Sequence, residues 1–244
     1  MGLCKDTAMI LSTRTFGESD KIVRFFSLNE GRLTGIAKGG KKSQKRFTNT
    51  LEPFNCVRIE FFEKATASMV RIENADIEES NSGLEVDLKK VCIASFFSEF
   101  VDRMTREKER NEALFETLRT VVLQTKRVEL NYSDILYYEL QMLDHLGYLP
   151  NFVRCVHCGI ELAEGERLGF SKEKGGIVCL ACSRFIPHRR YPQGFIPQLA
   201  SYSPDKGRTT EAFERMGRDI LEDFVSFHLD VRLKSYRLLK KVAG

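Results

Sequence analysis

The first 80 residues alternate between apolar and polar positions in short runs bounded by turn residues, which is the pattern of β-strands. Strands are predicted over residues 8–16, 20–28, 32–38, 54–62 and 68–77. Tight turns at 17–19 and 29–31 join the first three as hairpins. Because five short strands in an open sheet would leave unpaired edges, we predict a small closed barrel.

After residue 80 the apolar positions recur every three or four residues, which is the period of an amphipathic helix. Four helices are predicted. The second covers 111–124 with Asn111 as N-cap, and the third covers 131–146 with Gly147 as C-cap. The first and the fourth are indicated by apolar stripes, namely Leu88, Val91, Cys92, Ser95, Phe96 and Phe100 in the first and Phe213, Met216, Ile220, Phe224 and Phe227 in the fourth. Such stripes are typical of the core of a helical bundle. The predicted fold class is therefore α+β and multidomain, with a barrel over 1–80 and a helical domain over 81–244.

Composition places the chain among ordinary globular proteins, since 42% of its 244 residues are hydrophobic and 30% are charged. No apolar run approaches the roughly 18 residues that are needed to cross a bilayer. The N-terminus lacks the basic start and the apolar core of a signal peptide. We therefore expect a cytoplasmic protein with no membrane partner.

The net charge of +4 is small, but the positive charge is local. Six basic residues and no acidic one lie between Gly31 and Leu51, and five basic residues without an acid follow Asp230. Basic runs are often only solvated surface. Two of them, one on a glycine-rich loop, favour a polyanionic partner.

Four of the seven cysteines form two C-x2-C pairs that are separated by twenty residues. The pairs are Cys155 with Cys158 and Cys179 with Cys182. Two such knuckles can place four thiolates around one ion, and a hairpin turning at 174–176 would bring them together, so we predict a structural zinc module over about 151–187. Dithiol redox chemistry and metal-free thiols are the alternatives. His157, inside the first knuckle, is predicted to lie on the surface.

The stretch GIAKGGKK, within residues 35–42, is close to a phosphate-binding loop of the form G-x-x-x-x-G-K-[ST]. Its last position is Lys42, which cannot bind magnesium as a hydroxyl would, and no apolar stripe of a following helix is present. The sequence also lacks nucleophile-elbow, zinc-protease and paired-acid motifs. We therefore expect no enzyme, with a nucleotide hydrolase as a remaining rival.

The same stretch suits the backbone of a nucleic acid, because small barrels bind single strands with a cationic groove and stacking aromatics. The candidate phosphate contacts are Lys38, Lys41, Lys42, Lys45 and Arg46. Gly39 and Gly40 allow the backbone to approach closely. Phe47 could either stack on bases or anchor the loop into the core.

Several stretches together resemble the bacterial RecO recombination-mediator family. The N-terminal part of that family is similar to TRTFGESDKIVRFFSLNEGRLTGIAKGGKKS…LEPF in this chain. Its middle is similar to YYELQMLDHLGYLP followed by CVHCG…GFSKEKGGIVCLAC, and its C-terminal end is similar to RLKSYRLL. The resemblance implies an N-terminal OB-fold and a helical domain with an inserted Cys4 zinc module. The family's basic barrel residues map onto Arg32, Lys38, Lys41, Lys42 and Lys45, and its zinc ligands map onto Cys155, Cys158, Cys179 and Cys182.

The resemblance further implies a nucleoid-associated protein that binds single- and double-stranded DNA and anneals complementary strands. Its implied partners are RecR and, in some members, RecF. Such proteins help to load RecA onto strands coated by single-stranded-DNA-binding protein, whose C-terminal tail they can bind, here near Arg237. A zinc-containing module that binds RNA or protein is the alternative function.

Overall fold

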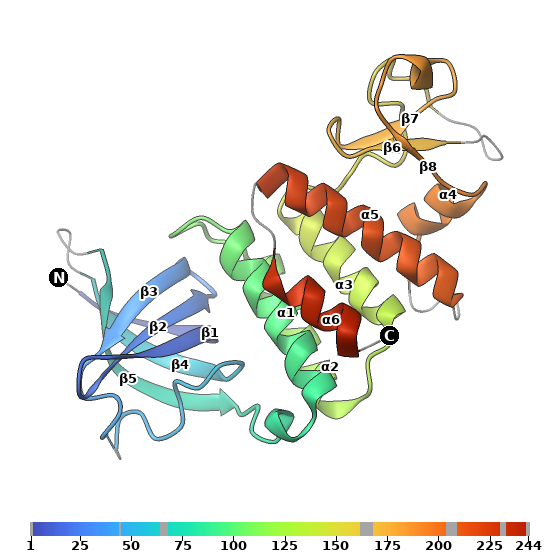
Figure 1. The fold of residues 1–244 in the computed structure, drawn as a ribbon. Helices are drawn as coiled ribbons and strands as arrows, with labels where there is room; N and C mark the ends of the chain where they lie inside the picture. Colours follow the sequence, from blue (N-terminus) through green and yellow to red (C-terminus); the bar gives the residue numbers. More distant parts are fainter. Residues whose placement is uncertain are drawn as a thin grey trace. The chain divides into compact units, whose positions relative to one another are not determined.

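The structure is a computed structural model that describes residues 2–43, 45–63, 68–161, 168–203, 209–229 and 233–242. Figure 1 shows a strand-rich N-terminal part followed by helices and a small second sheet. By internal packing the chain divides into two compact units, Met1–Glu129 with Ser235–Gly244, and Leu130–Lys234. Within the described residues, no helix is both long and apolar enough to cross a membrane.

The first unit contains a closed five-stranded barrel. Its strands are β1 (Leu3–Phe16), β2 (Asp20–Ser27), β3 (Gly31–Ala37), β4 (Cys56–Phe62) and β5 (Val70–Glu79). They pair in the order β1-β2-β3-β5-β4, with β4 returning to β1 and with β3 and β5 parallel. This arrangement confirms the predicted OB-fold barrel.

Alternation within each strand separates the barrel interior from its outer face. In β3, Leu33 and Ala37 point into the apolar core, while Thr34 and Ile36 are partly exposed. Gly35 lies at the closest approach of β3 to β5, where an added Cβ would come within 2.7 Å of the Ile72 side chain. A glycine is therefore required where the two parallel strands pair.

Residues 38–55 link β3 to β4 and close one end of the barrel. Phe47 and Leu51 are 2% and 0% exposed and belong to the barrel core. Phe47 therefore anchors this segment, and the alternative that it stacks on bases is wrong. The structure contains no helix in the described part of 38–55, as expected for a segment without an apolar stripe.

Three helices and a short 3-10 turn, η1 (Leu84–Val86), complete the first unit. The helices are α1 (Leu88–Met104), α2 (Glu112–Arg127) and α6 (Lys234–Val242). Asn111 caps α2 as predicted, accepting a hydrogen bond from the Leu114 amide at 3.0 Å. Leu88 is 68% exposed, so the buried stripe of α1 begins later than predicted.

Helix α6 was not predicted, and it packs on α1. The Tyr236 side chain is 1% exposed, and its ring centroid lies 5.0 Å from that of Phe96. The Ser235 amide donates a hydrogen bond to the Glu99 carboxylate at 2.9 Å. The C-terminal segment is therefore part of the first unit.

The second unit combines helices with a small three-stranded sheet. Its elements are α3 (Tyr132–His145), β6 (Gly169–Ser171), β7 (Gly176–Val178), η2 (Cys182–Arg184), β8 (Arg189–Arg190), α4 (Phe195–Ala200) and α5 (Glu211–Leu229). A capping box between Asn131 and Asp134 begins α3, and Gly147, at φ +71°, follows its end as predicted. Phe227 is 47% exposed, so the buried stripe of α5 ends earlier than predicted.

Candidate metal centre and nucleic-acid interface

The two cysteine pairs come together in the second unit. The Sγ atoms of Cys155, Cys158, Cys179 and Cys182 all lie within 4.8 Å of one another. Those of Cys158 and Cys179 are 3.8 Å apart. A tetrahedral zinc site with Zn–S bonds of about 2.3 Å has sulfur–sulfur edges of about 3.8 Å. The four residues can therefore hold one metal ion.

Local backbone geometry builds this cluster from the sequence. Gly159, at φ +73°, allows the sharp turn after the first knuckle, and its amide bonds the Cys155 carbonyl at 2.9 Å. The β6–β7 hairpin carries the second knuckle back to the first. There the Cys179 amide donates to the Cys155 sulfur at 3.4 Å, as amides do around thiolate ligands. His157 is exposed and is not among the clustered residues, as predicted.

The pKa values of two thiols in the cluster are shifted in opposite directions. Burial opposes ionisation of Cys155, but the backbone amides of Cys179, Cys158 and His157 outweigh it and lower its pKa to about 6. The hydrogen bond that the Cys182 thiol donates to Cys179 raises the pKa of Cys182 to about 12, and burial contributes a smaller increase. A cation bound among the sulfurs would favour the ionised form of the Cys182 thiol.

The predicted basic loop, residues 38–46, lies on the first unit beside the β1–β2 turn. The Gly39 amide donates to the Asp20 carboxylate at 2.9 Å, and the Lys41 amide donates to the Ser19 carbonyl at the same distance. At its other end the loop is held by Phe47 in the barrel core. The backbone of the loop is therefore attached to the barrel at both ends.

The structure separates the six predicted DNA-contacting residues into two groups. Lys41, Lys42 and Lys45 are exposed and form no ion pair with any residue that the structure describes. Lys38 is 2.7 Å from the Asp20 carboxylate. The Arg46 guanidinium donates to the Lys38 carbonyl at 2.9 Å and lies over the ring of Phe47. Three exposed lysines at the loop surface thus lack an ion pair within the described part of the chain.

Arg32 lies at the other end of β3, six residues from Lys38, which is about 20 Å along a strand. Its side chain is only 16% exposed. The guanidinium donates to the Thr105 carbonyl at 3.2 Å and lies 3.6 Å from the Asp102 carboxylate. The sequence mapping grouped Arg32 with the loop lysines, but the structure does not bring them together.

Two arginines on the outer face of the barrel were missed by the sequence analysis. Arg14 opposes Ile22, Ile22 opposes Ile36, and Ile36 opposes Arg71, so these residues form one row across four strands. The signal was present in the alternation of residues 12–16, where Arg14 occupies an outward position. Without the strand order, the two arginines could not be placed at the ends of one row.

The comparisons with known proteins cover both parts of the chain. Residues 1–81 match the family model described as "Recombination protein O N terminal", and residues 85–237 match "Recombination protein O C terminal". The chain belongs to the RecO family. The resemblance seen in the sequence is therefore confirmed.

Several curated relatives named "DNA repair protein RecO" are similar to this chain. The protein from Myxococcus xanthus is 32% identical over 240 residues, which is 97% of both chains. The protein from Desulfatibacillum aliphaticivorans is 31% identical over 247 residues, covering 96% of this chain and 95% of that one. The protein from Syntrophobacter fumaroxidans is 35% identical over 179 residues, or 73% and 71%.

The two RecO matches divide the described features between them. The N-terminal match includes all five barrel strands and the basic loop. The C-terminal match includes the four clustered cysteines and the first four residues of α6. Both sites described above therefore lie within the RecO-matched residues.

Proposed function

We propose that this protein is a non-enzymatic recombination mediator in DNA repair, which binds single- and double-stranded DNA and anneals complementary strands. Membership of the RecO family, and the name DNA repair protein RecO that its relatives carry, support the role in repair. The observation that carries the DNA contact is the basic loop, where Lys41, Lys42 and Lys45 are exposed and without ion pairs to described residues.

The chemistry of these lysines suits a phosphate backbone. Each ammonium is a point charge on a flexible stem, so it can follow successive phosphates without reading bases. The loop backbone is fixed to Asp20 and Ser19, which limits the ordering that binding would cost. Lys38, Arg46 and Arg32 already interact with protein groups, and we propose that they contribute mainly through their positive potential.

Annealing follows from charge alone in this proposal. Two complementary strands repel each other, and basic surfaces that neutralise part of their charge allow the bases to meet without nucleotide hydrolysis. No catalytic step is required. The described part of 38–55 offers no helix N-terminus to hold the phosphates of a nucleotide, which supports binding rather than hydrolysis.

We propose that the cysteine cluster holds one Zn²⁺ with a structural role. Four thiolate ligands complete a tetrahedral shell, so no position would remain for a reacting water. Three of the four cysteines are buried, and they join the knuckle at 155–158 to the one at 179–182. The ion would therefore stabilise the β6–β7 region of the second unit.

From family membership we also propose the protein partners. These are RecR, RecF, the C-terminal tail of single-stranded-DNA-binding protein and, indirectly, RecA. On this basis the protein acts in the cytoplasm, at the nucleoid. Co-purification with each partner, with and without DNA, tests these assignments separately from DNA binding.

Annealing of complementary oligonucleotides without nucleotide tests the proposed function. The variant Lys41→Glu with Lys42→Glu is compared with Lys172→Glu with Lys174→Glu, whose lysines are exposed on the β6–β7 hairpin. Each pair changes the net charge by −4, from +4 to 0. The loop pair should lose most binding and annealing, and the hairpin pair should retain both. Equal losses, or no annealing by the unmodified protein, would contradict the proposal.

A further inference from the structure

Every second residue of β1, β2 and β3 points to the outer face of the barrel, and the strand register shows which of these residues are neighbours. Thr34 opposes Arg24 on β2, and Arg24 opposes Ser12 on β1. The next outward positions along β1 are Arg14 and Phe16. Side chains that oppose each other across a strand pair lie on the same face, so these residues share one surface of the barrel.

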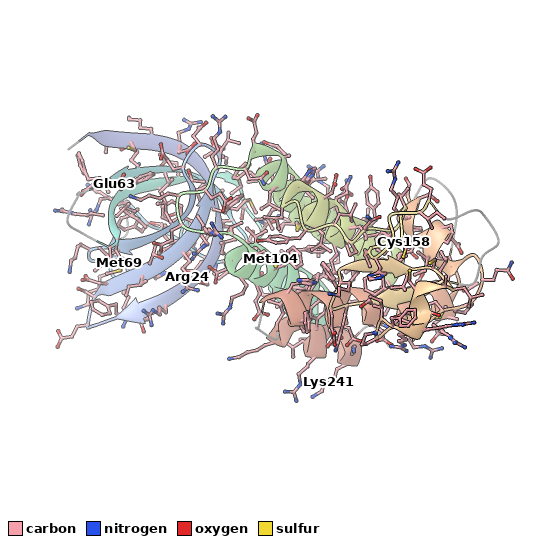
Figure 2. The ribbon with its side chains drawn as sticks, turned by 90° about the horizontal axis from the view of Figure 1, so that it is seen from above. Arg24, Glu63, Met69, Met104, Cys158 and Lys241 are labelled. Atoms are coloured by element: carbon pink, nitrogen blue, oxygen red, sulfur yellow. The ribbon has the colours of Figure 1, made fainter. Side chains whose placement is uncertain are left out.

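One half of this face is covered by the helices of the same unit. The Arg24 guanidinium, labelled in Figure 2, lies 2.6 Å from the Asp102 carboxylate of α1. The Phe26 ring lies 6.3 Å from the Phe115 ring of α2. The other half, toward the β1–β2 turn, is the part that carries Phe16.

Phe16 is the only exposed aromatic residue in the described barrel, and its side chain is 49% exposed. It lies directly opposite Asp20 in the β1–β2 ladder. The Asp20 carboxylate binds the Gly39 amide at 2.9 Å and the Lys38 ammonium at 2.7 Å. Because opposing side chains have Cβ atoms about 5 Å apart, the Phe16 ring lies beside the basic loop.

Arg14 adds a cation on the same face, two residues before Phe16. It is exposed and has no ion pair with any residue in the described part of the chain. Its cross-strand neighbour is the buried Ile22, so no acidic residue stands directly opposite Arg14 on β2. An aromatic ring flanked by cations matches a single strand, whose bases stack on the ring while its phosphates meet the cations.

We propose that Phe16 is a base-stacking residue and that, with Arg14 and the basic loop, it forms a site selective for unpaired nucleotides. The inference rests on the proposed DNA-binding function and adds a preference to it. In a duplex the base faces are stacked within the helix and cannot reach the ring. The lysines bind both forms of DNA, whereas Phe16 distinguishes the single strand from the duplex.

The experiment measures the affinity of the full chain for a single-stranded oligonucleotide, for a duplex of equal length and for a single strand whose central nucleotides lack bases. The variants are Phe16→Ala, Phe16→Trp, and Leu3→Ala as a matched control. Leu3 is 43% exposed at the other end of β1, so it is an apolar truncation outside the proposed site. The double variant Lys41→Glu with Lys42→Glu reports on the phosphate contacts.

Phe16→Ala should weaken single-strand binding by about tenfold and change duplex binding less than about twofold. Phe16→Trp should restore single-strand affinity, and Leu3→Ala should change neither. The base-free oligonucleotide should bind unmodified protein more weakly, and Phe16→Ala should remove that difference. Single-strand affinity unchanged in Phe16→Ala, or equal losses on both substrates, would overturn the inference.

The lysine variant separates the two proposals. If it loses binding to both substrates while Phe16→Ala binds normally, the stacking site is wrong and the proposed function stands. If the unmodified protein binds neither substrate, both are wrong.

Discussion

Neutralising the three exposed lysines of the basic loop should reduce the salt dependence of DNA binding by a calculable amount. The variant carries Lys41→Ala, Lys42→Ala and Lys45→Ala. The three side chains are exposed and form no ion pair with described residues, so their removal leaves no acidic partner uncompensated. The loop backbone keeps its attachment to Asp20, and Phe47 keeps its place in the core. The fold should therefore be retained.

The magnitude follows from counterion release. Each phosphate contact on a single strand contributes about 0.7 to the slope of log affinity against log salt concentration. Three contacts contribute about 2, which over the fourfold range from about 50 to 200 mM salt corresponds to about 20-fold in affinity. The unmodified protein should thus lose about 20-fold more affinity than the variant across that range.

Fluorescence anisotropy of a labelled oligonucleotide, titrated at several salt concentrations, measures both slopes. Lys172→Ala with Lys174→Ala serves as the control and should leave the slope unchanged. Lys38→Ala should reduce the slope by less than the loss of Lys41, Lys42 or Lys45 alone does, because Lys38 already binds Asp20. A slope that is the same in the triple variant and in the unmodified protein would refute the assignment of these lysines as phosphate contacts.

Three further predictions concern the rest of the structure. Cys158→Ser should reduce bound metal, measured by elemental analysis, well below the one ion per chain expected for unmodified protein, whereas Cys4→Ser, outside the cluster, should not. Acid should loosen the basic loop. The Gly39 amide, and to a smaller extent the Lys38 ammonium, hold the pKa of the Asp20 carboxyl below its usual 3.8. The bonds from Asp20 to the loop are therefore complete above pH 3.8, and they are lost as the pH falls through the lower pKa of the folded state. Amide hydrogen exchange of the loop reports this, and Asp20→Asn should abolish the pH dependence. Tyr236→Ala should lower the free energy of unfolding by about 3 kcal/mol in urea titrations, and Leu238→Ala, 46% exposed on the same helix, by less than about 0.5 kcal/mol; similar losses in the two variants would contradict the packing of α6 on α1.

Local patterns explain which elements were predictable. The barrel strands were found because alternation and turn residues are encoded within a few residues of each other. The cysteine cluster was found because the C-x2-C spacing itself places two thiolates toward one ion. Helix α6 was missed because its burial depends on α1, and Tyr236 meets Phe96 across 140 residues of sequence.

Charge shows most clearly what the sequence could not decide. The sequence alone determined that this is an OB-fold barrel followed by helices and a four-thiolate cluster, and that basic residues concentrate between β3 and β4. It could not determine which of those cations are available, because their acidic partners come from distant segments. Only the tertiary structure brings Asp102 to Arg32 and Asp20 to Lys38, and it leaves the side chains of Lys41, Lys42 and Lys45 without an ion pair to any described residue. The β1–β2 pairing places the exposed Phe16 opposite Asp20, and the structure alone shows that Asp20 holds the Gly39 amide and the Lys38 ammonium of this loop.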